Sequence, residues 1–135
     1  MKLTVDSFAW IELIRETPVG ERARDLIENT ETCFTPAIVL AEVAHRCLKD
    51  GMREGLVSEE LSAIGEASEI VPIDATLALS ASIATTELRA RSRALGLTPP
   101  GLGDGLVLAT SRRTSAPILT GDRHFKDLPE AHWLV

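Results

Sequence analysis

The sequence contains no tyrosine, and aromatic residues make up only 4% of it. Its interior must therefore be built mainly from aliphatic side chains. No run of about 18 apolar residues is present, which excludes a membrane-spanning helix. The opening residues, MKLTVDSF, carry no long apolar stretch after the charge, so no signal peptide is predicted.

Cysteine is also scarce. The two cysteines, Cys33 and Cys47, lie within apolar stretches and belong to no CxxC or Cys/His metal pattern. Buried free thiols are favoured over a disulfide. Together with the missing signal peptide and spanning helix, this predicts a cytoplasmic protein.

The rest of the composition is that of a globular protein. The chain has 135 residues, of which 44% are hydrophobic and 25% charged. This length is sufficient for a single domain, residues 1–135, with a core of its own. No internal repeat, low-complexity tract or interdomain linker interrupts it.

Short apolar runs alternate with segments of helical periodicity, such as the one containing Phe8, Ile11 and Ile14. Thr35 and Pro36 are expected to supply an N-cap and a first-turn proline, and Asp74 a second cap. The pattern predicts strands at 2–5, 32–35, 70–73, 117–120 and 132–135, and helices at 8–16, 21–29, 36–49, 57–67, 75–95 and 104–113. Strands that alternate with helices indicate a three-layer α/β/α sandwich with a mostly parallel central sheet.

Four acidic residues follow strands or lie near helix starts in this scheme. Asp6 directly follows the first strand, and Asp122 follows the fourth by one glycine. Asp104 begins a helix, and Glu42 lies about two turns into another, on the same stripe as its start. Because ligands of open parallel sheets bind beyond the carboxyl ends of the strands, the four carboxylates are predicted to converge.

Such a cluster predicts a metal site. Like charges repel at close range, and a divalent cation would hold the four acids ionised. Oxygen ligands suit Mg²⁺ or Mn²⁺ and disfavour zinc. A cation of this kind activates water for hydrolysis of a phosphodiester.

The net charge of −6 bears little on this hypothesis. Setting aside the four proposed site acids, of 20 acidic residues in all, leaves 16 against 14 basic residues, a difference of −2. Bound metal would offset more of the negative charge. A nucleic-acid partner is therefore not excluded.

Four segments together resemble the PIN domain: TVDS, TPAIVLAEVAHR, GDGLVLATS and ILTGDRHF. Within that family the likeness is to the VapC-type toxin ribonucleases of toxin–antitoxin pairs, and it covers essentially the whole chain. The resemblance implies Mg²⁺- or Mn²⁺-dependent cleavage of single-stranded or structured RNA by a homodimer that a small antitoxin inhibits. It implies that the metal-binding, catalytic acids are Asp6, Glu42, Asp104 and Asp122, with Ser7 and Thr120 as polar neighbours that orient an acid or a water.

One position departs from the family pattern. Gly105 follows Asp104 where a helix-favouring residue is more common, and we expect it to loosen the first helical turn. Arg123 is the basic residue nearest to the proposed site in sequence and is a candidate contact for a substrate phosphate. His124 is interpreted as a packing residue rather than a group that transfers protons.

Plainer interpretations remain for several residues. Asp6 and Asp104 could be helix caps only, as we take Asp74 to be. Glu42 is harder to explain in that way, because it lies in the apolar run AIVLAEVA, where a carboxylate without a partner is costly. The arginines of the segment RARSR, Arg89, Arg91 and Arg93, either follow RNA phosphates or solvate a helix.

Three other functions stay open at this point. A related PIN nuclease could act in RNA processing rather than as a toxin. A receiver-type signalling domain is also a small acidic α/β fold that binds Mg²⁺, but it needs an acidic pair after its first strand, and here Ser7 follows Asp6. An inactive PIN scaffold is disfavoured because all four acids are present.

Overall fold

The computed structural model describes all 135 residues. Its five strands form one sheet in the order β3-β2-β1-β4-β5, and every neighbouring pair is parallel. The strands are β1 (Lys2–Val5), β2 (Thr32–Pro36), β3 (Glu69–Val71), β4 (Ile118–Thr120) and β5 (Ala131–Trp133). The predicted α/β class with a parallel sheet is confirmed.

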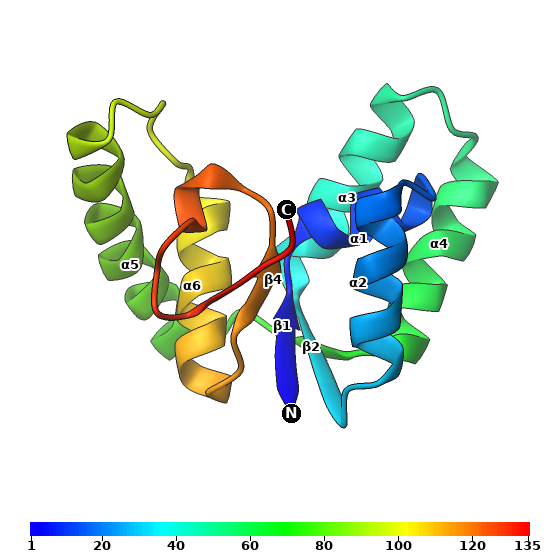
Figure 1. The fold of residues 1–135 in the computed structure, drawn as a ribbon, viewed down its shortest axis with the longest axis horizontal. Helices are drawn as coiled ribbons and strands as arrows, with labels where there is room; N and C mark the ends of the chain where they lie inside the picture. The colour runs from blue at the N-terminus through cyan, green and yellow to red at the C-terminus, as the bar shows by residue number, and fades with distance from the viewer.

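Helices cover both faces of this sheet. They are α1 (Ser7–Ile14), α2 (Pro18–Glu28), α3 (Ala37–Lys49), α4 (Glu54–Ala67), α5 (Ala75–Ala94) and α6 (Leu102–Thr114), with a short 3₁₀ helix η1 (Arg123–Phe125). Figure 1 shows α5 and α6 on one side of the strands and α1 to α4 on the other. α6 contacts β1, β2 and β4 directly, and α5 packs on α6.

The core is aliphatic, as the scarcity of aromatic residues predicts. Of the 20 residues in the main buried cluster, only Trp10 and Phe125 are aromatic. The central strands β1 and β4 supply fully buried leucine, valine and isoleucine side chains, because both faces of a parallel sheet are covered. Cys33 and Cys47 are buried and free, which confirms the expected thiols.

Two predicted helix starts are wrong. Thr35 does not cap α3, because β2 continues to Pro36 and the helix begins one residue later. The Thr35 hydroxyl instead accepts a hydrogen bond from Trp10 Nε1 at 3.1 Å and pairs with Ser68 Oγ at 2.7 Å. The helix predicted at 21–29 begins three residues earlier, because Pro18 opens α2 at its first position, where the backbone N–H that proline lacks has no partner within the helix.

Other boundaries agree or shift by a few residues. Asp74 caps α5 by accepting from the Leu77 backbone N–H at 2.8 Å, as predicted. α6 begins at Leu102 rather than at Asp104, which is its third residue. No helix is both long and apolar enough to cross a membrane.

Candidate metal site at the carboxyl edge of the sheet

Asp6 lies at the end of β1 and caps α1. The residue is only 3% exposed. One carboxylate oxygen accepts from the Ser7 backbone N–H, and the other accepts from Thr120 Oγ1, both at 2.8 Å. Thr120 is within reach because β4 pairs with β1 in parallel, with Val5 opposite Leu119. Both predicted polar neighbours, Ser7 and Thr120, therefore contact Asp6.

Asp122 is attached to the same threonine. Its backbone N–H donates to Thr120 Oγ1 at 3.0 Å, and its side chain caps η1 by accepting from the His124 N–H at 2.9 Å. Thr120 thus joins the acid after β1 to the acid after β4. Thr120 is completely buried, so this link is held rigidly.

Asp104 reaches the site from α6. Its carboxylate also accepts from the Gly101 N–H at 3.2 Å, which closes the first turn of the helix. The first turn of a helix favours negative charge. Asp104, Asp122 and His124 bring one potential ligand atom each to within 4.8 Å of one another.

Glu42 approaches from α3, on the other side of the sheet. A Cβ at Gly103 would lie 2.9 Å from Glu42 Oε2, so the absence of a side chain there admits this carboxylate to the start of α6. Glu42 Oε1 is buried and has no hydrogen-bond partner. An unpaired buried carboxylate oxygen is costly unless something compensates its charge.

The mutual effects of these acids show in their pKa values. The pKa of Asp6 is raised from 3.8 to about 7, mainly by burial. The hydrogen bond from Thr120 lowers this pKa, and the charges of Asp122, Glu42 and Asp104 raise it further. Burial also raises the pKa of Glu42 from 4.5 to about 7, with contributions from Asp104 and Asp122. Burial and the charge of Asp122 raise the pKa of Asp104 as well. The structure therefore places all four predicted acids close enough for their charges to interact, with Asp104 and Asp122 in the group that also contains His124.

His124 belongs to this group, and its interpretation as a packing residue was incomplete. Nδ1 lies 2.9 Å from Asp122 Oδ1, and Nε2 lies 2.8 Å from the Thr98 carbonyl oxygen. Both partners only accept, so both ring nitrogens donate only in the charged imidazolium. Burial opposes that charge, but the Thr98 hydrogen bond and the two nearby acids raise the pKa of His124 overall.

Arg91 of α5 holds the turn that carries Asp122 and His124. Its guanidinium donates to the His124 carbonyl at 3.1 Å and to the Lys126 carbonyl. Nothing in the segment RARSR marks Arg91 for this role over its two neighbours. The only feature of the sequence that could have indicated a role for His124 at the site is its position two residues after Asp122.

The remaining candidates lie differently from expectation. Arg123 forms no ion pair and lines an exposed hollow with Leu95, Leu97 and Lys126. Gly105 has a packing role: a Cβ there would lie 1.9 Å from Thr85 Oγ1 and 2.5 Å from the Ala81 carbonyl. Glycine at this position permits the close contact of α5 with α6 that positions Asp104. We expected Gly105 to loosen the first turn of the helix, but the structure shows that a larger residue would not fit there.

This donor set fits a divalent cation. Carboxylate oxygens from four separate segments converge, three of the four acids have raised pKa values, and one buried oxygen lacks a partner. A hard cation such as Mg²⁺ or Mn²⁺ compensates such a cluster. The fold and site together define an α/β protein with an acidic centre at the carboxyl edge of its sheet.

Comparison with known proteins identifies the family. The PIN domain family model matches residues 3–131, and the chain belongs to that family. This membership removes the receiver-type alternative. No curated protein sequence matches the chain.

Solved structures share the fold. A toxin–antitoxin complex from Klebsiella pneumoniae superposes with a TM-score of 0.69 at 17% identity, covering 98% of each chain. VapC20 of Mycobacterium tuberculosis, a toxin that cleaves the sarcin–ricin loop, has a TM-score of 0.69 at 16% identity over 96% of this chain and 98% of its own. VapBC2 of Rickettsia felis, bound to a promoter DNA fragment, reaches 0.66 at 20% identity over 97% and 96%.

Proposed function

We propose that this protein is a metal-dependent endoribonuclease that hydrolyses RNA phosphodiester bonds with an activated water, and that it is the toxin of a toxin–antitoxin pair. The observation that carries the proposal is the convergence of four carboxylates, one of them with a buried oxygen that has no protein partner. Membership of the PIN family and the likeness to toxin structures support it.

In this proposal Asp6, Glu42, Asp104 and Asp122 hold Mg²⁺ or Mn²⁺. When bound, the cation supplies positive charge that makes water more acidic and stabilises negative charge developing on the phosphate. The chain's own residues keep the carboxylates in place. Thr120 orients Asp6 and the Asp122 backbone, and His124 holds a proton on Nδ1 directed at Asp122.

The test is cleavage of total RNA in Mg²⁺, Mn²⁺ or EDTA, with mapping of the cut ends. Asp122→Asn preserves volume but removes charge, so cleavage should fall by orders of magnitude while the fold persists. Asp74→Asn is the matched control, because Asp74 also follows a strand and caps a helix but lies outside the cluster. Full cleavage by both Asp6→Asn and Asp122→Asn would refute the assignment.

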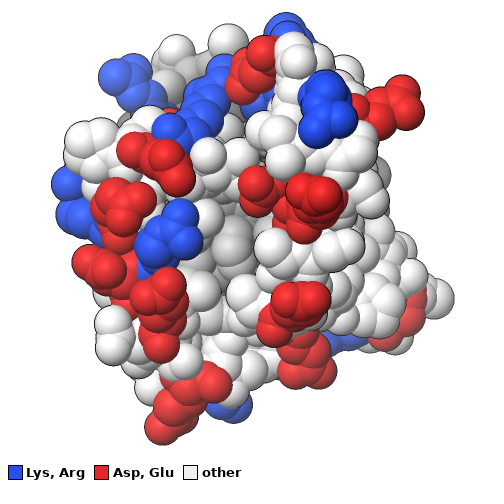
Figure 2. All heavy atoms as spheres, turned by 90° about the vertical axis from the view of Figure 1, so that its right-hand side faces the viewer, with Lys and Arg blue, Asp and Glu red and all other residues white.

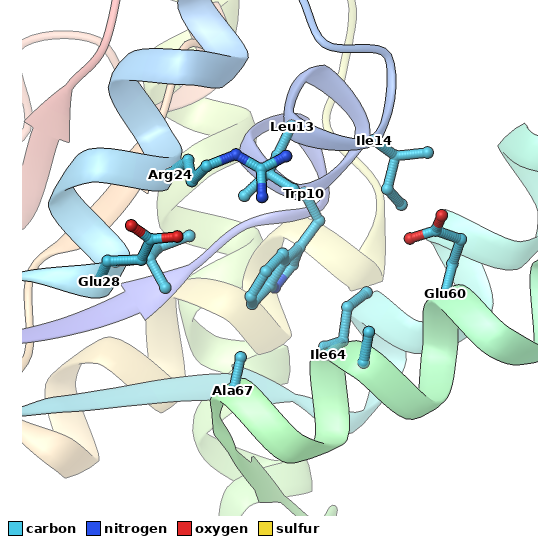
Figure 3. Close-up of a pocket in the computed structure, with 10 residues that line it drawn as sticks. Trp10, Leu13, Ile14, Arg24, Glu28, Glu60, Ile64 and Ala67 are labelled. Carbon is cyan, nitrogen blue, oxygen red and sulfur yellow. The ribbon is translucent and has the colours of Figure 1, made fainter.

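An antitoxin partner is proposed for a groove between α1, α2 and α4, defined by the residues in Figure 3. Trp10, Leu13 and Ile64 form part of its apolar floor, and Glu28 and Glu60 lie at its sides. Its volume of about 150 Å³ is on the order of the cavity that admits one benzene-sized group. Figure 2 shows mostly acidic side chains on both sides of a furrow on this face, and Arg24 is the one basic residue in the groove lining. An apolar helix with basic flanks suits such a surface.

Inhibition is proposed to follow from an antitoxin Arg or Lys placed among the four acids. Its positive charge would compete with metal for the same carboxylates, in a desolvated, charge-assisted contact. Activity would then be lost without unfolding.

The experiment is co-purification with the product of the adjacent upstream gene, with cleavage measured in its presence and absence. Light scattering on the free protein tests the proposed homodimer, which would cover the exposed Leu79 and Ile83 on α5. A monomer that binds no neighbouring gene product would favour the RNA-processing alternative.

A further inference from the structure

Five basic side chains gather around the end of α5, the segment that follows it, and η1. They are Arg89, Arg91, Arg93, Arg123 and Lys126. The arginines that form salt bridges are Arg15, Arg24, Arg46, Arg112 and Arg113, so none of the five is in a salt bridge. Asp127 is the one acid beside them, in the hollow with Arg123 and Lys126. Unpaired cations in one place leave a local positive potential on a protein whose net charge is −6.

The segment between α5 and α6 separates these cations into two exposed hollows. Arg89 and Arg93 line the first, together with Leu97 and Pro99. The second is the hollow lined by Arg123, Lys126 and Asp127. Leu97 belongs to both, so the two hollows are neighbours.

This segment also borders the acidic site. The Thr98 carbonyl accepts from His124 Nε2 at 2.8 Å, and His124 contacts Asp122. Figure 1 shows the segment running from the end of α5 past η1 to the start of α6. A chain bound at the carboxylates therefore has the two hollows directly beside it.

Several of the cations are held in place before any ligand binds. Arg89 Nε donates to the Pro100 carbonyl at 3.1 Å, which leaves its terminal nitrogens free. Lys126 Nζ lies 5.7 Å from the centre of the Trp133 ring. Arg91 is held as well, but its guanidinium is engaged with backbone carbonyls, so we assign no phosphate to it. Arginine forks that are positioned in advance match phosphate oxygens.

We propose that these hollows bind the phosphate backbone of single-stranded RNA as it leaves the carboxylate site. One phosphate lies at Arg123 and Lys126, and a later one lies at Arg93 and Arg89. This inference rests on the proposed nuclease function and deepens it. The acidic face of α2 and α4 (Figure 2) repels the same polyanion, so the charge distribution directs RNA to the α5 side.

The test uses the double variant Arg93→Gln/Arg123→Gln, which takes one cation from each hollow. Neither side chain makes a hydrogen bond or ion pair in the structure, so the fold should not change. Lys2→Gln/Lys49→Gln removes the same charge from exposed positions, at the start of β1 and the end of α3. Affinity for a labelled single-stranded RNA of about 12 nucleotides, within the range of known single-strand sites, is measured at increasing salt. An Asp122→Asn background containing Mg²⁺ keeps the RNA intact.

Affinity falls as salt rises, and each lost phosphate contact should reduce the steepness of the plot of log affinity against log salt by about 0.7. The slope of the double variant should therefore be shallower than that of wild type by about 1.4. At low salt its affinity should fall roughly tenfold, since one exposed ionic contact contributes at most about fivefold. In the otherwise wild-type enzyme KM should rise while kcat stays unchanged. The lysine control should differ little from wild type in all three measurements.

The outcomes separate the two claims. A double variant whose slope and affinity equal those of the lysine control overturns the phosphate path, even if the wild type cleaves RNA in a metal-dependent way. A wild type that neither binds nor cleaves RNA overturns the proposed function itself.

Discussion

Replacing Asp6 with Asn should stabilise the metal-free protein at alkaline pH. Burial and three neighbouring acids raise the pKa of Asp6 from 3.8 to about 7. The native carboxyl therefore keeps its proton up to about pH 7, whereas the unfolded chain releases it near 3.8. Between these values the native state binds more protons, so this group makes stability fall as pH rises.

The magnitude follows from the same two pKa values. A difference of about three corresponds to up to about 4 kcal/mol of unfolding free energy. The asparagine side chain of the variant resembles the neutral acid and avoids this loss. Its oxygen can accept from the Ser7 N–H while its amide donates to Thr120 Oγ1. The variant should therefore equal wild type near pH 4 and exceed it by up to about 4 kcal/mol at pH 8.

The assay is urea unfolding in EDTA at several pH values. Asp74→Asn is the control: its exposed carboxyl has a pKa lowered to about 2 by Arg113, so its stabilising effect is present above pH 3.8 and is lost only below it. Mn²⁺ should narrow the gap between the Asp6 pair at pH 8, because metal at 100 times its Kd stabilises wild type by about 2.7 kcal/mol, which offsets most of the variant's advantage. If Asp6→Asn shows no pH-dependent gain in EDTA, the acids do not destabilise the metal-free site and the reasoning fails.

Two further predictions concern the packing and the positioning of the site. Gly105→Ala should lower the unfolding free energy by about 1–3 kcal/mol in thermal or urea melts, because the new methyl group would meet Thr85 Oγ1 and the Ala81 carbonyl. The control is Gly65→Ala in α4, where the new methyl group meets nothing within 4 Å, and an equal response of the two variants would contradict the steric argument. Arg91→Met keeps the aliphatic stem but removes the donors that hold the Asp122 turn, so Mn²⁺ affinity measured by titration should weaken at least about tenfold. Arg93→Met loses no hydrogen bond and should bind Mn²⁺ as wild type does. Unchanged affinity in Arg91→Met would show that the turn needs no support from α5.

The order of elements and the convergence of the acids were readable from the sequence. Apolar strands alternate with amphipathic helices, and that alternation has essentially one compact solution, a parallel sheet covered on both faces. Once the sheet is parallel, the acids that follow β1 and β4 must share an edge with the helix starts. Asp6 and Asp122 were therefore placed near each other by local position alone.

Element boundaries were less predictable because several local signals competed. Thr35 and Pro36 form a good helix start in isolation, but pairing with β3 keeps both residues in β2. A proline such as Pro18 can end one helix or open the next, and in the structure it opens α2. Propensity ranks such alternatives, and tertiary pairing selects one of them.

The sequence by itself determined the fold class, the aliphatic core, the free thiols and which four acids meet. Only the tertiary structure decided how those acids are held: Thr120 between Asp6 and Asp122, His124 against Thr98, and Gly103 making room for Glu42. The apolar groove beside Trp10 and the basic hollows beside Leu97 were equally hidden. The physical reason is range: periodicity and capping act within a few residues along the chain, whereas these contacts join segments whose distance apart is set only when the whole core packs.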